Sequence, residues 1–224
     1  MGKRLENAKK EIDPTKKYSP SEAIALAKKT ATTKFTGNVE VHVRLGIDPK
    51  KSDQAIRGTI TLPHGSGKTK RIAAFVTEAK EKEATDAGAV LVGGEDLIKK
   101  IKETEQLNFD IAIAEPAMMA KMASIAKLLG PRGLMPSPKT GTVTPDVARA
   151  IKEFAAGKME FKNDDSANIH MLLGKADFPD EQIIANYTAF MEALKNSRPA
   201  TIKNEYIVSV SVNSTMGPGI KVQQ

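Results

Sequence analysis

Segments near both ends of the chain alternate apolar and polar positions. Residues 39–45 carry valine or leucine at every second position, and this period of two predicts a strand with one buried face and one face in water. Residues 206–211 alternate in the same way and predict the last strand of the chain. Shorter strands are predicted at residues 58–63, 159–162 and 167–173, the last of them ended by Gly174-Lys175.

Two helices accompany these strands. One is predicted over residues 20–30, where a serine can cap the first turn and Pro20 is tolerated. The other is predicted over residues 178–198, with apolar side chains at helical spacing and a proline at its end. Together the two chain ends predict an α+β layer with antiparallel strands.

The middle of the chain has a different pattern. Continuous apolar runs at residues 72–76, 89–92 and 109–114 predict strands that are buried on both faces. Helices are predicted between and after them, at residues 78–87, 95–103, 117–129 and 145–156. A loop rich in proline and glycine occupies residues 130–141. This order of strands and helices is typical of a parallel α/β unit.

A domain that is split in sequence is the simplest architecture that joins the two patterns. Residues 1–67 and 157–224 would form one α+β domain, and residues 68–156 an α/β domain inserted into it. Insertion leaves two linkers side by side, which we expect near residues 65–68 and 155–158.

Glycines are concentrated in these two linkers. Gly65, Gly67 and Gly157 can adopt backbone angles that other residues avoid, so they permit large changes of direction. The sequence therefore predicts a hinge at these three positions.

The charge of the chain indicates a polyanionic partner. The formal net charge is +7, and residues 1–65 alone account for +6 of it. Nucleic acid is the first candidate for such a partner. A generic basic binding module without preference for one folded RNA is the plainer alternative.

Several classes of protein are excluded by composition. The chain has no cysteine, which excludes disulfides and thiolate metal sites and suits a reducing compartment. No apolar run approaches ~20 residues, so no membrane span is predicted. The charged N-terminus lacks the apolar core of a secretory signal.

Candidate catalytic motifs are weak. Residues 65–69, Gly-Ser-Gly-Lys-Thr, end like a phosphate-binding loop, but Leu62 stands where that loop needs a glycine and a strand is predicted to follow. Gly93-Gly94 follows a predicted strand, where α/β folds often bind ligands, but a tight turn explains it equally. A nucleotide-dependent α/β enzyme is therefore kept only as the alternative function.

The histidines do not form a recognisable metal motif. His42, His64 and His170 are single and widely separated in sequence, and none has the spacing of a zinc site. We therefore expect no metal and no cofactor.

The most specific signal is a series of motifs in a fixed order along the chain. The first motifs are Lys34–Gln54 (KFTGNVEVHVRLGIDPKKSDQ), Arg57-Gly58 and Leu62–Gly65; the central ones are Leu129–Pro136 and Lys139–Thr142; the last ones are Glu160–Asp164, Ile169-His170, Gly174-Lys175 and Ser214–Pro218. Together they resemble the family of bacterial large-subunit ribosomal protein one, the "L-one" family.

The resemblance implies a fold and a function. It implies a discontinuous, ferredoxin-like split β-α-β domain that binds RNA, with an inserted Rossmann-like three-layer α/β domain. It implies a non-enzymatic, cytoplasmic constituent of the ribosome that binds 23S-type ribosomal RNA at the mobile stalk. Assistance in releasing deacylated tRNA from the exit site, repression of its own operon mRNA, and a monomeric state off the ribosome are implied as well.

The resemblance also implies the residues that contact RNA. These are Lys34, Phe35, Lys158, Lys162, Lys175, Thr215, Met216 and Gly217. Gly37 stands where relatives often carry a larger polar residue. We expect the Thr215 hydroxyl to read a ribose 2′-OH, and we expect bulk at Gly217 to clash with RNA rather than with the fold, because the loop follows the predicted last strand.

Overall fold

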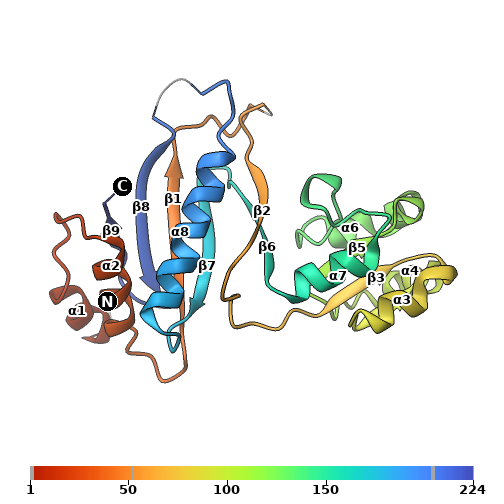
Figure 1. Cartoon of the computed structure of the whole chain (residues 1–224), viewed down its shortest axis with the longest axis horizontal. Coiled ribbons are helices and arrows are strands. Elements are labelled where there is room, and N and C mark those ends of the chain that lie inside the picture. Colours follow the sequence, from red (N-terminus) through yellow and green to blue (C-terminus); the bar gives the residue numbers. More distant parts are fainter. Residues whose placement is uncertain (1–2, 52, 203–204, 224) are drawn as a thin grey trace. The chain divides into compact units, whose positions relative to one another are not determined.

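The structure is a computed structural model that describes residues 3–51, 53–202 and 205–223. The chain forms two compact units, shown in Figure 1. Unit 1 combines Met1–Gly67 with Met159–Gln224, and unit 2 is the continuous segment Lys68–Lys158. Mixed α/β structure, the coarse prediction from the sequence, is confirmed.

A four-stranded antiparallel sheet organises unit 1, in the order β7-β1-β8-β9. Its strands are β1 (Asn38–Leu45), β7 (Asn168–Lys175), β8 (Ile207–Ser214) and β9 (Ile220–Val222). A separate pair joins β2 (Arg57–Thr61) and β6 (Lys158–Lys162). Strand β1 is central because Val41 pairs with Met171 on one side and with Val212 on the other.

The predicted alternation in β1 is confirmed by its burial. Val39, Val41 and Val43 are fully buried in one core with Ile24 and Phe190, which come from helices α2 (Pro20–Lys29) and α8 (Asp180–Asn196). Burying a valine side chain stabilises the fold by about 1.5–3 kcal/mol. The helices therefore cover one face of the sheet, and the polar residues of β1 lie on the other.

The start of α2 follows from local chemistry. The Ser19 hydroxyl accepts from the Glu22 N–H, and the Glu22 carboxylate accepts from the Ser19 N–H. This reciprocal pair satisfies two backbone donors that a helix start leaves open, and Pro20 occupies the first turn, where no N–H is needed.

Three features of unit 1 differ from the sequence prediction. Helix α1 (Lys3–Lys10) was not anticipated, because only Ala8 is buried and the helix has no apolar stripe. Strand β9 follows the strand predicted to be the last, and its three residues are too short to show a period. Strand β7 continues through Gly174, where a Cβ would lie 3.1 Å from the Phe178 ring, so that glycine makes room for the ring rather than ending the strand.

Unit 2 is built on a parallel sheet in the order β4-β3-β5. Its strands are β3 (Ile72–Phe75), β4 (Leu91–Gly93) and β5 (Ile111–Ala114), and its longer helices are α3 (Glu81–Asp86), α4 (Glu95–Thr104) and α7 (Val147–Ala155). Ala73 and Phe75 face one core with α4, and Ile72 and Ala74 face a second core with α7. The predicted burial of β3 on both faces is confirmed.

One predicted helix of unit 2 is broken. Instead of a continuous helix over 117–129, the chain forms short turns: the 3₁₀ helices η2 (Pro116–Met118) and η3 (Ala123–Ile125) and the α-helices α5 (Met119–Met122) and α6 (Ala126–Leu129). Met118, Met122, Ile125 and Leu129 are all buried, so one face still packs inward. Two further 3₁₀ turns are η1 (Glu78–Lys80) and η4 (Pro138–Thr140). No helix in the described parts of the chain is long and apolar enough to cross a bilayer.

A buried asparagine holds the first linker. Asn186 of α8 is fully buried, its Oδ1 accepts from the His64 N–H (3.1 Å), and its Nδ2 donates to the carbonyls of Gly65 (2.9 Å) and Leu173 (2.7 Å). A Cβ on Gly67 would lie 2.9 Å from the Phe178 ring. Asn186 therefore ties the backbone at His64 and Gly65 to α8 and β7.

Candidate functional site

Six of the eight predicted contact residues belong to one end of the four-stranded sheet. Asn38, the first residue of β1, pairs with Lys175 at the end of β7, and the Thr215 N–H, just after β8, donates to the Asn38 carbonyl (2.8 Å). Lys34 and Phe35 lie in the loop before β1, with Thr36 and Gly37 between Phe35 and the strand. We call this region, residues 34–38, 175 and 214–217, the loop end of the sheet.

Two large apolar side chains are exposed at the loop end. Phe35 is 56% exposed and Met216 is 67% exposed. Neither side chain contributes to the core of unit 1. Exposed apolar side chains on loops at the end of a sheet are suited to contact a ligand, because they add nothing to the packing of the core.

Thr215 fixes the turn that carries Met216. Its hydroxyl accepts from the Asn38 N–H at 2.9 Å, which continues the β1–β8 pairing beyond the end of β8. The Thr215 hydroxyl is therefore already engaged with the backbone of β1. Its expected contact with a ribose hydroxyl stays a prediction.

Gly217 is required by the turn itself. Its N–H donates to the Ser214 carbonyl at 2.7 Å, and a Cβ at this position would lie 2.3 Å from the buried Ser214 Oγ. Met216 adopts a positive φ of 61°. The expectation that bulk at Gly217 would leave the fold unchanged is therefore wrong, because the clash lies within the protein and β9 follows the turn.

Arg4 of α1 joins the two loops of this region, and sequence reasoning missed it. Its guanidinium donates to the Met216 carbonyl (2.6 Å) and to the Thr32 hydroxyl (3.3 Å). The basic character of the N-terminus was the one sequence signal for a role of Arg4 in this region. The hydrogen bond itself could not be predicted, since Arg4 and Met216 are separated by almost the whole chain.

Removal of the Arg4 side chain is expected to loosen the turn at residues 214–217. Loss of one charge-assisted hydrogen bond of about 1 kcal/mol should speed hydrogen exchange of the Gly217 amide about fivefold in Arg4→Ala. Lys10→Ala, on the same helix, is the control and should leave this amide unchanged. Equal exchange in Arg4→Ala and wild type would show that Arg4 does not hold the turn.

The other two predicted contact residues lie elsewhere. Asn163, next to Lys162, bridges to Ile169 at the far end of β7, which places Lys162 roughly 20 Å along the strand from Lys175. Lys158 forms an ion pair with Glu153 (2.8 Å) within unit 2. Its side chain also lies over the Phe154 ring. The structure therefore does not gather all eight residues into one site.

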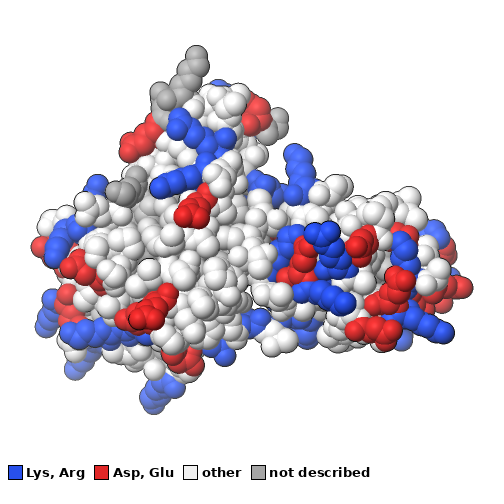
Figure 2. Space-filling view, viewed as in Figure 1, with Lys and Arg blue, Asp and Glu red and all other residues white. Residues whose placement is uncertain are grey.

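Charge is mixed over the visible surface. On the face drawn in Figure 2, acidic and basic side chains are interspersed on both units, and neither sign dominates there. A ligand that recognised this face by charge alone would find little selectivity.

His42 and His170 are in contact, contrary to the expectation that the histidines are separate. They face each other across β1 and β7, with Nδ1 atoms 2.6 Å apart. Asp164 Oδ2 lies 3.4 Å from His170 Nε2, and hydrogen bonds, first from the Asn168 backbone N–H, hold the pKa of Asp164 below its usual range. Sequence spacing could not reveal this pair because strand register decides it.

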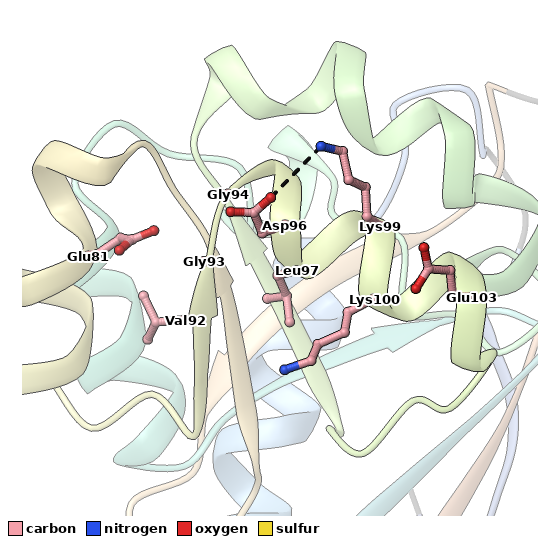
Figure 3. Close-up of a pocket in the computed structure, with 9 residues that line it drawn as sticks. All are labelled: Glu81, Val92, Gly93, Gly94, Asp96, Leu97, Lys99, Lys100 and Glu103. Atoms are coloured by element: carbon pink, nitrogen blue, oxygen red, sulfur yellow. Dashed lines mark ion pairs between the residues drawn. The ribbon is translucent and has the colours of Figure 1, made fainter.

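A cavity of about 380 Å³ lies beside β4 in unit 2, as Figure 3 shows. Asp96 and Lys99 form an ion pair there (3.8 Å). Helix α4 begins after Gly94 with Glu95 and Asp96 in its first turn, so its own carboxylates occupy the position that favours anions. The cavity does not suit a phosphate. Residues 65–69 are followed by β3 rather than by a helix, which excludes the phosphate-loop interpretation.

Comparison with known proteins gives a consistent result. A model of the "Ribosomal protein L1p/L10e family" matches residues 27–218. The chain is 50% identical over 223 residues to the large ribosomal subunit protein uL1 of Mesoplasma florum, covering 100% of this chain and 98% of that protein. It is 51% identical over 215 residues to the protein of the same name from Nocardia farcinica, covering 96% and 90%.

Proposed function

The chain belongs to the ribosomal protein L1p/L10e family, and from this we propose that it is a structural, non-enzymatic protein of the large ribosomal subunit whose unit 1 binds 23S-type ribosomal RNA through the loop end. We place it on ribosomes in the cytoplasm. The observation that carries the proposal is that Phe35 and Met216, both exposed, lie on loops at the same end of the four-stranded sheet.

The chemistry of the loop end suits folded RNA. An aromatic ring can stack on an unpaired base, and a flexible thioether can follow the surface of a base or ribose. Lys34 and Lys175 add positive charge for phosphates. The turn at 214–217 is held by Thr215 and Arg4, so little ordering is required on binding.

We extend the proposal to two further RNA partners implied by the family resemblance. The ribosome-bound protein would contact exit-site tRNA while that tRNA is released. An operon mRNA that resembles the ribosomal site would compete for the loop end, which would repress translation. A shared site predicts that ribosomal RNA and mRNA exclude each other.

We also infer the roles of the two units. Unit 1 would be the ferredoxin-like RNA-binding domain, and unit 2 the Rossmann-like insert. Of the three predicted hinge glycines, Gly65 is held by Asn186, so the hinge would act at Gly67 in the first linker, where φ is 71°, and at Gly157 in the second, where φ is 108°.

A footprint of the full chain on total ribosomal RNA tests the main proposal. Wild-type protein should protect one site in large-subunit RNA, and Gly217→Val should lose this protection because the added side chain displaces the turn. Gly219→Ala is the matched control, since a Cβ there meets no atom within 4 Å. Protection spread evenly over the RNA would instead favour a generic basic module, and equal footprints for the two variants would place the site elsewhere.

A further inference from the structure

The exposed face of the unit 1 sheet carries a second cluster, which the proposed RNA site does not use. His42 and His170 are directly opposite on β1 and β7, with ring centroids 4.9 Å apart. The outer ring nitrogen of each histidine faces an oxygen: His42 Nε2 lies 2.7 Å from Asn213 Oδ1, and His170 Nε2 lies 3.4 Å from Asp164 Oδ2.

These two oxygens determine where the ring protons sit. An ionised carboxylate only accepts hydrogen bonds, so the contact with Asp164 favours the tautomer of His170 whose Nε2 carries the proton. With its Oδ1 turned toward His42, the Asn213 amide favours the same tautomer for His42. In the neutral rings, both Nδ1 atoms then present lone pairs, and these lone pairs point at each other across 2.6 Å. A cation between the two nitrogens, either a proton or a metal ion, removes the repulsion between these lone pairs.

We propose that His42 and His170 bind one divalent transition-metal ion, zinc in the first place, through their Nδ1 atoms. At 2.6 Å a proton can bridge the two nitrogens. Zn–N bonds of about 2.0–2.1 Å at a tetrahedral angle require nitrogens about 3.3 Å apart, which is a separation greater by about 0.7 Å. The His170 side chain is 55% exposed, so its ring has space to move by this amount.

The surrounding hydrogen bonds support the proposal independently. Histidines that ligate metals usually donate their other ring N–H to a carboxylate or a carbonyl, which fixes the tautomer and orients the ring. Asp164 and Asn213 are placed to do this for the two rings. Asp164 is itself held by the N–H groups of Ser166 and Asn168, at 2.9 and 2.6 Å.

The donor set defines the class of ion. Imidazole nitrogen suits zinc, copper and nickel, whereas magnesium and calcium prefer oxygen. No group of three or more histidine, cysteine or carboxylate ligands occurs in the described ranges, so two positions on the metal would remain for water. The site would therefore bind an exchangeable ion rather than a structural one.

A zinc titration of the full chain, without RNA, tests the proposal. Calorimetry in a non-coordinating buffer should show one Zn²⁺ per chain, and ¹⁵N spectra should show shifts at Nδ1 of His42 and His170 but not at His64. His42→Asn should weaken binding at least tenfold, whereas His64→Asn, which removes an exposed imidazole elsewhere, should not change it. Asn213→Ala should weaken binding about 10–100-fold, as expected for an orienting residue.

The opposite results would overturn the proposal. Zinc that shifts His64 as strongly as His42, a His42→Asn variant that binds like wild type, or the absence of binding would each exclude the site. The ring shifts are read on the wild-type chain, so the result does not depend on the folding of any variant. Magnesium at the same concentration should leave all three histidines unchanged. Since no RNA is present, failure here leaves the RNA proposal unaffected.

Discussion

Replacement of Asn186 by leucine is expected to lower the free energy of unfolding of unit 1 by about 3–5 kcal/mol. The side chain satisfies the His64 N–H and the carbonyls of Gly65 and Leu173, and it is fully buried. Leucine has a similar size but no polar atom, so all three backbone groups would lose their partner. A buried polar group without a partner costs about 1–3 kcal/mol.

Urea unfolding followed by tyrosine fluorescence measures this effect in unit 1 alone. The chain has three tyrosines and no tryptophan, and Tyr18, Tyr187 and Tyr206 all lie in unit 1. Thr188→Ala, on the exposed side of the same helix, is the control and should change stability by less than about 0.5 kcal/mol. A leucine variant as stable as this control would contradict the prediction.

A second substitution at residue 186 tests the direction in which stability changes with pH. Asn186→Asp keeps an acceptor for the His64 N–H but places carboxylate oxygens against two carbonyls. Burial and these carbonyls would raise the pKa of the new carboxyl in the folded state above its unfolded value. Relative to wild type, the variant should therefore be least destabilised at acidic pH, where the protonated group can donate, and its loss of stability should grow as the pH rises through the folded-state pKa.

Loss of the Phe35 ring is expected to weaken binding of the ribosomal RNA that we propose as ligand by about 1–3 kcal/mol, which is about 5–150-fold, without loss of stability. The ring is 56% exposed and lies outside the core, so its removal costs unit 1 little. Stacking on a base would bury it, and alanine cannot replace that contact. Met216→Ala should have an effect in the same direction.

Filter binding at two salt concentrations measures this loss. Val208→Ala is the matched control, because Val208 is an apolar side chain of β8 with 45% exposure, near the end of the strand away from the loop end. The change in Phe35→Ala should be similar at both salt concentrations, because stacking releases no counterions. If Val208→Ala weakens binding as much as Phe35→Ala, the interface lies on another part of the sheet.

Local patterns predicted the elements well, because their causes are local. The alternation in residues 39–45 and the cap at Ser19 each depend on neighbours within a few residues, and the structure confirms β1 and α2. The break in the helix predicted over 117–129 shows the limit of this reasoning. Buried residues at helical spacing specify a face but not an unbroken backbone.

Contacts between distant segments could not be predicted in this way. The pairing of His42 with His170 depends on strand register, and the hydrogen bond from Arg4 to Met216 joins the two ends of the chain. Register also explains why Lys162 lies far from Lys175, although both were candidates for one site. Motifs along a chain indicate which residues are candidates for a site, whereas the pairing of strands in the sheet determines which of them are in contact.

The central position of β1 sets the order in which the protein can fold during its synthesis. Both partners of β1, β7 and β8, are translated only after the whole of unit 2 has been translated. The parallel sheet of unit 2 can form first. Both edges of β1 stay unpaired until β7 and β8 have been made. Residues 214–217 follow unit 2, β7 and β8 in the chain, so a nascent chain acquires the loop end only after all of these have been made. A nascent chain that stops before β8 would consequently lack the surface that we propose binds RNA.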